Sequence, residues 1–213
     1  MQQNTALIVV DVQNGFTPGG QLAVAGADQI IPDINQLAQY FNHIVLTQDW
    51  HPEDHISFAD NHPDKQPFEH IELAYGTQVL WPKHCVQGSH DAALHPALNL
   101  PTAQLIIRKG YHQNIDSYSA FLEADQSTTT GLDAYLKAKA IDTVFIVGIA
   151  TDFCVAWSAI DACQLGFKTF VIADACKAID LNTSLQHAWQ NMLAHGVQRV
   201  YLKDIPHLLA QQD

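Results

Sequence analysis

The stretch TVFIVGIATDFCVAWSAIDACQL, residues 143–165, contains the two patterns that decide the fold. Residues Thr143–Gly148 are a short run of apolar and β-branched side chains, which is typical of a buried strand. After a short turn, residues Asp152–Leu165 show helical spacing, and Gly166 follows at a place where helices commonly end. A buried strand that leads directly into a helix is the repeating unit of parallel α/β sheets.

The same alternation continues on both sides of this stretch. Short apolar runs predict five further strands, at Ala6–Val10, His43–Thr47, Leu105–Arg108, Thr169–Ala173 and Val197–Leu202. Helical spacing predicts three further helices, at 30–41, Leu132–Ala140 and Ser184–His195. Crossovers between parallel strands are right-handed and place helices on both faces of the sheet. The predicted fold is therefore a three-layer α/β/α fold, in which a mainly parallel six-stranded sheet lies between two layers of helices.

One long segment, residues 50–101, interrupts the alternation. It is rich in His, Pro, Asp and Gly and has neither a helical nor a strand period. At about fifty residues it is far longer than an ordinary connection, so we expect a functional insertion there. The chain length fits one domain, which we expect to span residues 1–213.

Composition narrows the class of partner. Ten Lys and Arg oppose 22 Asp and Glu, which argues against nucleic acid or an anionic membrane as a partner. No run approaches the roughly 20 apolar residues of a membrane span, and Met1–Thr5 does not resemble a secretory signal. Four cysteines in a chain this long do not form a disulfide framework. We therefore expect a cytoplasmic protein.

Chemically active side chains follow three of the predicted strands, where open parallel sheets bind their ligands. Cys154 lies at the start of a predicted helix, whose free N–H groups favour a thiolate and can form an oxyanion hole. Asp11 could accept the proton of the thiol, and Lys109 could stabilise both anions. Each residue alone also fits an ordinary role as a buried thiol, a turn former or a solvated charge. Their convergence favours a nucleophilic cysteine site.

A metal site is a second hypothesis. Asp49 and His51 form an Asp-x-His pair whose side chains share one face if the backbone is extended. His84 is a candidate third ligand, and His55 could add a fourth contact. Two imidazoles and one carboxylate suit Zn²⁺ or Fe²⁺. Because the chain contains 12 histidines, the residues alone leave the grouping open.

Motifs along nearly the whole chain, from Ala6 to about Val200, resemble the nicotinamidase/pyrazinamidase family of isochorismatase-like cysteine hydrolases. They are DVQNGF at 11–16, TQDWHPEDHISF at 47–58, LWPKHCVQG at 80–88, RKG at 108–110, DSYSAF at 116–121 and GIATDFCV at 148–155. The resemblance implies a catalytic triad of Asp11, Lys109 and Cys154. It also implies an oxyanion hole made by the backbone N–H groups of Ala150 and Cys154, and a cis peptide bond just before Ala150.

The resemblance further implies metal ligation by Asp49, His51 and His84, whereas the residue matching His55 ligates in some members only. Aromatic side chains can be core residues or pocket walls, and the resemblance favours the second role for three of them. Phe16 and Trp81 match residues that flank the substrate ring, and Tyr118 lies in a pocket-forming motif. The chain departs from many relatives at Phe153, where they carry Tyr or His; this change affects packing and removes no catalytic group.

The implied activity is the hydrolysis of nicotinamide to nicotinate and ammonia through a cysteine thioester, with pyrazinamide as a further substrate, in NAD salvage. One divalent metal ion per chain is implied, Zn²⁺ or Fe²⁺, with Mn²⁺ as another option, and a homo-oligomer is left open. Three alternatives also remain. They are a metal-free relative such as an isochorismatase or carbamoyl amidohydrolase, a non-haem iron oxygenase, and a non-enzymatic metal-binding protein.

Overall fold

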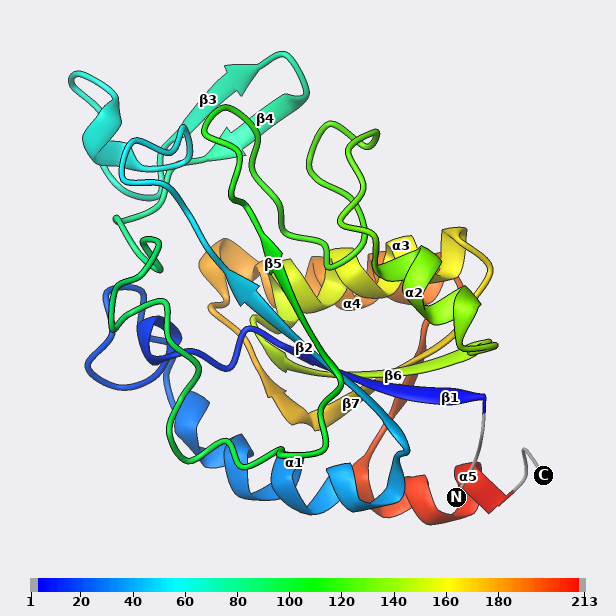
Figure 1. Cartoon of the computed structure of the whole chain (residues 1–213). Helices are drawn as coiled ribbons and strands as arrows, with labels where there is room; N and C mark the ends of the chain where they lie inside the picture. The colour runs from blue at the N-terminus through cyan, green and yellow to red at the C-terminus, as the bar shows by residue number, and fades with distance from the viewer. Residues whose placement is uncertain (1–3, 211–213) are drawn as a thin grey trace.

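A six-stranded parallel sheet forms the centre of the computed structural model, which describes residues 4–210 (Figure 1). The strand order is β5-β2-β1-β6-β7-β8, and every pair of neighbours runs parallel. The strands are β1 (Thr5–Val10), β2 (His43–Asp49), β5 (Leu105–Lys109), β6 (Thr143–Ile149), β7 (Lys168–Lys177) and β8 (Gln198–Val200). The predicted sheet is confirmed.

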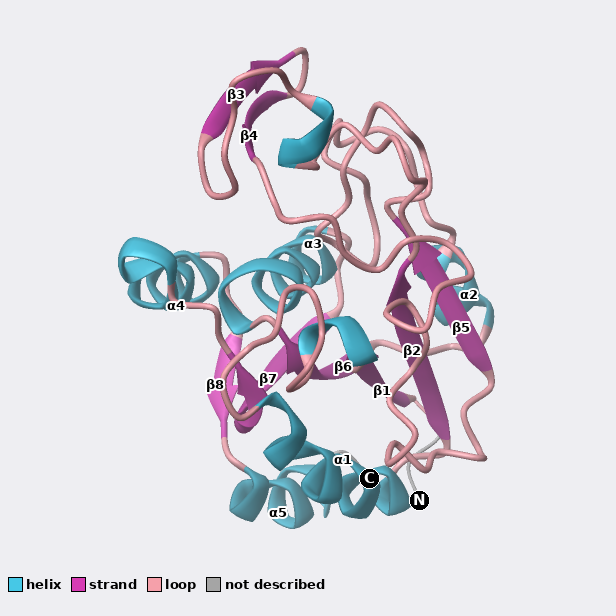
Figure 2. Ribbon diagram, turned by 90° about the vertical axis from the view of Figure 1, so that its left-hand side faces the viewer, coloured by secondary structure: helices cyan, strands magenta, loops and turns pink. Residues whose placement is uncertain are grey.

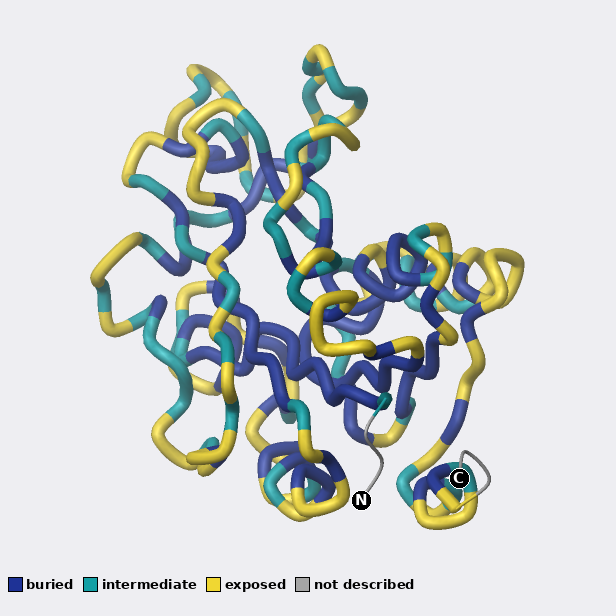
Figure 3. The backbone as a smooth tube through the Cα atoms, turned by 45° about the vertical axis from the view of Figure 1, so that its right-hand side comes forward, coloured by how far each residue is buried: buried dark blue, intermediate teal, exposed yellow. Residues whose placement is uncertain are grey.

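Helices cover both faces of this sheet (Figures 1 and 2). Helices α1 (Ile31–Leu37) and α5 (Ile205–Ala210) pack on one face, against Leu7 and Val9 of β1. The alternate residues of β1, such as Ile8, point to the other face. That face is covered by α2 (Leu132–Ala138), α3 (Ala156–Gln164) and α4 (Ser184–Ala194). The central strands are buried along their length (Figure 3). Because both of their faces are covered, these strands read as continuous apolar runs in the sequence.

The prediction differs from the structure mainly at the ends of elements and within 50–101. The helix expected at 30–41 is divided into one α-helical segment, α1, between two 3₁₀ turns, Ala27–Ile30 and Ala38–Tyr40. The expected strand 197–202 contains only three strand residues, and α5 was not predicted. The insertion holds an antiparallel hairpin of β3 (His70–Leu73) and β4 (Gly76–Val79), which the sequence hid because its residues are largely polar and half-exposed.

The point where the strand order changes direction determines where the site lies. The chain moves outward from β1 to β2 and β5 and then crosses back to β6, which pairs with the other side of β1. In open parallel sheets a crevice forms at this point, beyond the carboxyl ends of the strands. Gly148 allows β6 to approach β1 closely: it has a φ of +118°, and a Cβ there would clash with the carbonyl oxygen of Val10. Asp11 and the 150–154 turn follow these two strands.

None of the helices within residues 4–210 combines the length and the apolar character needed to cross a membrane. All four cysteines are free, as expected of a chain without a disulfide framework.

Candidate active site and metal centre

Lys109, the last residue of β5, brings the three predicted triad residues together. Its side chain is completely buried, and its ammonium Nζ lies 2.9 Å from Oδ2 of Asp11 and 3.3 Å from Sγ of Cys154. Nζ also donates a hydrogen bond of 3.0 Å to the carbonyl oxygen of Ser117. A buried cation therefore lies within contact distance of both the carboxylate and the thiol.

Asp11 is held in place by the neighbouring strand. Its backbone has a φ of +48°, and its N–H donates to Oγ1 of Thr47, which in turn donates to Oδ1 of Asp11 at 2.5 Å. Burial raises the pKa of the Asp11 carboxyl, and the Lys109 ammonium partly offsets this shift. A carboxylate with a raised pKa is suited to accept and return a proton.

Cys154 lies in a π-helical turn, Thr151–Val155, that precedes α3. The expected helix thus begins as a wider turn, in which the N–H groups of both Phe153 and Val155 donate to the carbonyl oxygen of Ala150. The peptide bond between Ile149 and Ala150 is cis, in agreement with the resemblance.

Burial, which the sequence does not show, is the largest influence on the pKa of the Cys154 thiol. Burial raises this pKa well above its ordinary value, and Lys109 opposes the shift without cancelling it. A raised pKa favours the thiol form, so a base next to the sulfur would assist its reaction as a nucleophile. Asp11 occupies that position.

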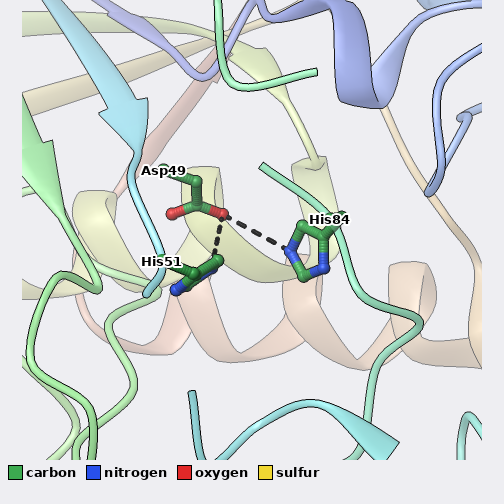
Figure 4. Close-up of side chains that lie close together, drawn as sticks. All are labelled: Asp49, His51 and His84. Carbon is green, nitrogen blue, oxygen red and sulfur yellow. Dashed lines mark ion pairs between the residues drawn. The ribbon is translucent and has the colours of Figure 1, made fainter. Parts of the chain in front are cut away.

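Asp49, His51 and His84 form a buried group whose donor atoms all lie within 4.8 Å of one another (Figure 4). Oδ2 of Asp49 lies 3.5 Å from Nε2 of His51 and 3.8 Å from Nε2 of His84. The Nδ1 atoms of the two rings face backbone carbonyl oxygens, of Gly110 at 2.8 Å and of Pro82 at 2.7 Å. A carbonyl oxygen can only accept, so each Nδ1 carries the hydrogen, and in the neutral ring Nε2 then has a lone pair available for a metal ion. The three side chains therefore fit a divalent metal ion.

Asp49 also contacts the triad, a role that the sequence did not reveal. Its Oδ1 pairs with the ammonium of Lys109, while its Oδ2 faces the two imidazoles. Burial opposes ionisation, but Lys109 and His51 together lower the pKa of Asp49 well below its ordinary value. The amide of Gln13 fixes the end of β2 by donating to Asp49 O and accepting from Asp49 N. One carboxylate thus contacts both the two imidazoles and Lys109.

His55 lies beside this group without joining it. Its Nδ1 faces Oγ of Ser57 at 2.7 Å, and its Nε2 faces the carbonyl oxygen of Ile115 at 3.2 Å. Burial lowers the pKa of His55 to about 4. Its ring centroid is 4.3 Å from that of His51, with which it and Asp116 form a second cluster of potential donors. Because both of its ring nitrogens form hydrogen bonds, His55 packs against the His51 ring and supports it.

One pocket is lined both by Cys154 and by the candidate metal ligands Asp49, His51 and His84. The three aromatic residues expected to line it, Phe16, Trp81 and Tyr118, all do so. Trp81 donates from Nε1 to the hydroxyl of Tyr118 at 2.9 Å, and the Phe153 ring lies 4.9 Å from the Trp81 ring, nearly perpendicular to it. Four further lining residues were missed, because apolar or loop residues of a pocket look like core or turn residues in a sequence: Leu22, Asp116, Phe153 and Ile179.

The fold and this pocket define an α/β protein whose binding site, with a buried cysteine, lies at the point where the strand order reverses. A family model described as an isochorismatase domain matches residues 5–200. A nicotinamidase from Acinetobacter baylyi is 73% identical over 202 residues, which cover 95% of this chain and 94% of that protein.

Two solved structures extend the comparison. A nicotinamidase/pyrazinamidase from Acinetobacter baumanii superposes with a TM-score of 0.95 at 70% identity, covering 96% of this chain and 99% of that one. A pyrazinamidase of Pyrococcus horikoshii in complex with zinc gives a TM-score of 0.77 at 34% identity, covering 93% and 99%. The chain belongs to the nicotinamidase/pyrazinamidase family of isochorismatase-domain hydrolases. This membership removes the oxygenase and the non-enzymatic alternatives.

Proposed function

We propose that this chain hydrolyses nicotinamide to nicotinate and ammonia, accepts pyrazinamide as a further substrate, and serves NAD salvage in the cytoplasm. One observation carries the proposal: a single buried pocket holds Cys154 at one wall and the Asp49–His51–His84 group at another. An aromatic amide has two ends to be recognised, a carboxamide and a ring. The pocket offers a nucleophile for the first and a metal group with aromatic walls for the second.

The acylation half-reaction uses the triad. Asp11 accepts the proton of Cys154 while Lys109 stabilises the thiolate, and the sulfur attacks the carboxamide carbon. The oxygen that becomes negative accepts hydrogen bonds from the backbone N–H groups of Ala150 and Cys154. Asp11 then returns the proton to the departing ammonia, which leaves a thioester on Cys154.

Deacylation repeats these steps with water. Asp11 accepts a proton from a water molecule, whose oxygen attacks the thioester carbon. The same two N–H groups stabilise the second oxyanion. Collapse of this intermediate releases nicotinate and returns the proton to the Cys154 sulfur.

The metal ligands would be Asp49, His51 and His84, and the ion one Zn²⁺ or Fe²⁺ per chain, with Mn²⁺ as the third choice. When bound, the ion supplies a Lewis acid for the lone pair of the pyridine nitrogen. Phe16 and Trp81 would hold the ring between them, and the His51 and His84 rings are fixed by their carbonyl partners. The pocket thereby orients the carboxamide toward Cys154.

A comparison of nicotinamide with benzamide, which has the same carboxamide but no ring nitrogen, tests this function. We expect kcat/KM for benzamide to be lower by about a hundredfold, because it lacks the group that a metal ion would bind. In His84→Ala, metal content measured by mass spectrometry should fall and the preference for nicotinamide should largely disappear. His95→Ala, a change in a half-exposed loop histidine, is the matched control. Equal rates for the two amides in the wild type would contradict the proposed orientation of the ring.

A further inference from the structure

We propose that Gln78, on the β3–β4 hairpin, is a positioning residue for the aromatic wall of the substrate pocket. The hairpin lies in the insertion, between the predicted metal ligands His51 and His84 in the chain. This wall consists of the Tyr118 and Trp81 rings. That it contacts the nicotinamide ring rests on the proposed function, whereas the hydrogen bonds that fix the two side chains do not.

Gln78 is the buried residue of a hairpin that is otherwise half-exposed. It is 2% exposed, whereas the preceding Thr77 is exposed and the following Val79 is partly exposed. The amide uses both of its ends. Oε1 accepts from the hydroxyl of Tyr75 at 3.1 Å, and Nε2 donates to the carbonyl oxygen of Val79 and to Oδ2 of Asp116, both at 2.7 Å. Two acceptor oxygens around one atom fix it as the NH₂ group, so the orientation of the amide is determined.

The same NH₂ group reaches the pocket wall. Nε2 of Gln78 lies 3.2 Å from the hydroxyl of Tyr118, which accepts the indole N–H of Trp81 at 2.9 Å. Both rings line the pocket in front of Cys154. A continuous chain of polar contacts therefore runs from the hairpin through Gln78 and Tyr118 to Trp81.

A closed ring of hydrogen bonds makes this connection rigid. The N–H of Asp116 donates to the Tyr75 hydroxyl at 3.4 Å, the hydroxyl donates to Gln78, and Gln78 donates back to the Asp116 carboxylate. The next residue, Ser117, accepts from Nζ of Lys109 through its carbonyl oxygen. Gln78 thus holds Asp116 and, through it, the segment that carries the Tyr118 ring, while the bond from Lys109 fixes Ser117 independently.

Gln78→Met is the variant of choice, because Met has a similar length but cannot donate or accept as an amide does. Changing Asp116 instead would disturb its cluster with His51 and His55. We expect KM for nicotinamide to rise about tenfold while kcat stays within about twofold, because the wall contacts the ring in both the ground state and the transition state. Metal content should be unchanged.

Fluorine NMR of 5-fluorotryptophan-labelled protein reports directly on the environment of the Trp81 side chain. The Trp81 resonance, assigned with Trp81→Phe, should shift or broaden in Gln78→Met and stay in place in the control Thr77→Val. Thr77 lies on the same strand but bonds outward to Glu72. Gln78→Asn, whose amide is too short to span both partners, should act in the same direction if the methionine variant does not fold.

An unmoved Trp81 resonance together with an unchanged KM would overturn the proposal. An inactive wild-type protein would contradict the proposed function instead, and the NMR comparison would still decide whether Gln78 positions the wall.

Discussion

Replacement of Lys109 by Met is expected to lower kcat by about a thousandfold and to slow the alkylation of Cys154 near neutral pH. Lys109 is the buried cation between Asp11, Asp49 and Cys154. Without it, the carboxylate of Asp11 would oppose the thiolate that it must help to form, since like charges raise each other's pKa. Burial already raises the pKa of Cys154, and Lys109 lowers it. Loss of the ammonium should therefore move the curve of alkylation rate against pH to higher pH.

The measurement is the rate of reaction with iodoacetamide across pH, in the wild type and Lys109→Met. Lys109→Arg is the matched control, because it keeps the charge but changes the shape, and partial recovery is expected. Leaving two buried carboxylates uncompensated costs about 3–5 kcal/mol, so folding of the variant is verified by circular dichroism first. Superimposed pH curves would remove Lys109 from the triad.

Replacement of Cys154 by Ala is expected to reduce kcat by more than about 10⁴-fold, because no other thiol replaces the nucleophile in the pocket. Metal content and binding of nicotinate should persist, since neither depends on the sulfur. Cys163→Ala, a change on α3 outside the pocket, controls for the loss of a thiol and should remain active. Hydrolysis of nicotinamide by Cys154→Ala at more than a few per cent of the wild-type rate would exclude the thioester mechanism.

The sequence predicts the sheet well because the central strands are buried on both faces. Val144, Ile146 and their neighbours form unbroken apolar runs that no surface element imitates. The meeting of Asp11 and Lys109 followed from the same signal, because they lie at the ends of such runs and parallel strands end at one edge. The boundaries were less accurate where short turns of 3₁₀ or π geometry replace regular helix, as at Thr151–Val155.

Other features depend on contacts between distant segments and leave no local pattern. Asp49 contacts Lys109 with one carboxylate oxygen and the His51 and His84 imidazoles with the other. These contacts require three distant parts of the chain to meet. The engagement of both His55 nitrogens is equally invisible in a sequence. Burial raises the pKa of Cys154, and burial is a property of the folded chain that a sequence does not show.

The proposed reaction is tested by incubating the purified, reduced and metal-loaded protein with nicotinamide and quantifying nicotinate and ammonia together. We expect both products to appear in equal amounts and alkylation of Cys154 to abolish them. Absence of both products, or turnover that persists after complete alkylation of Cys154, would contradict the proposed reaction.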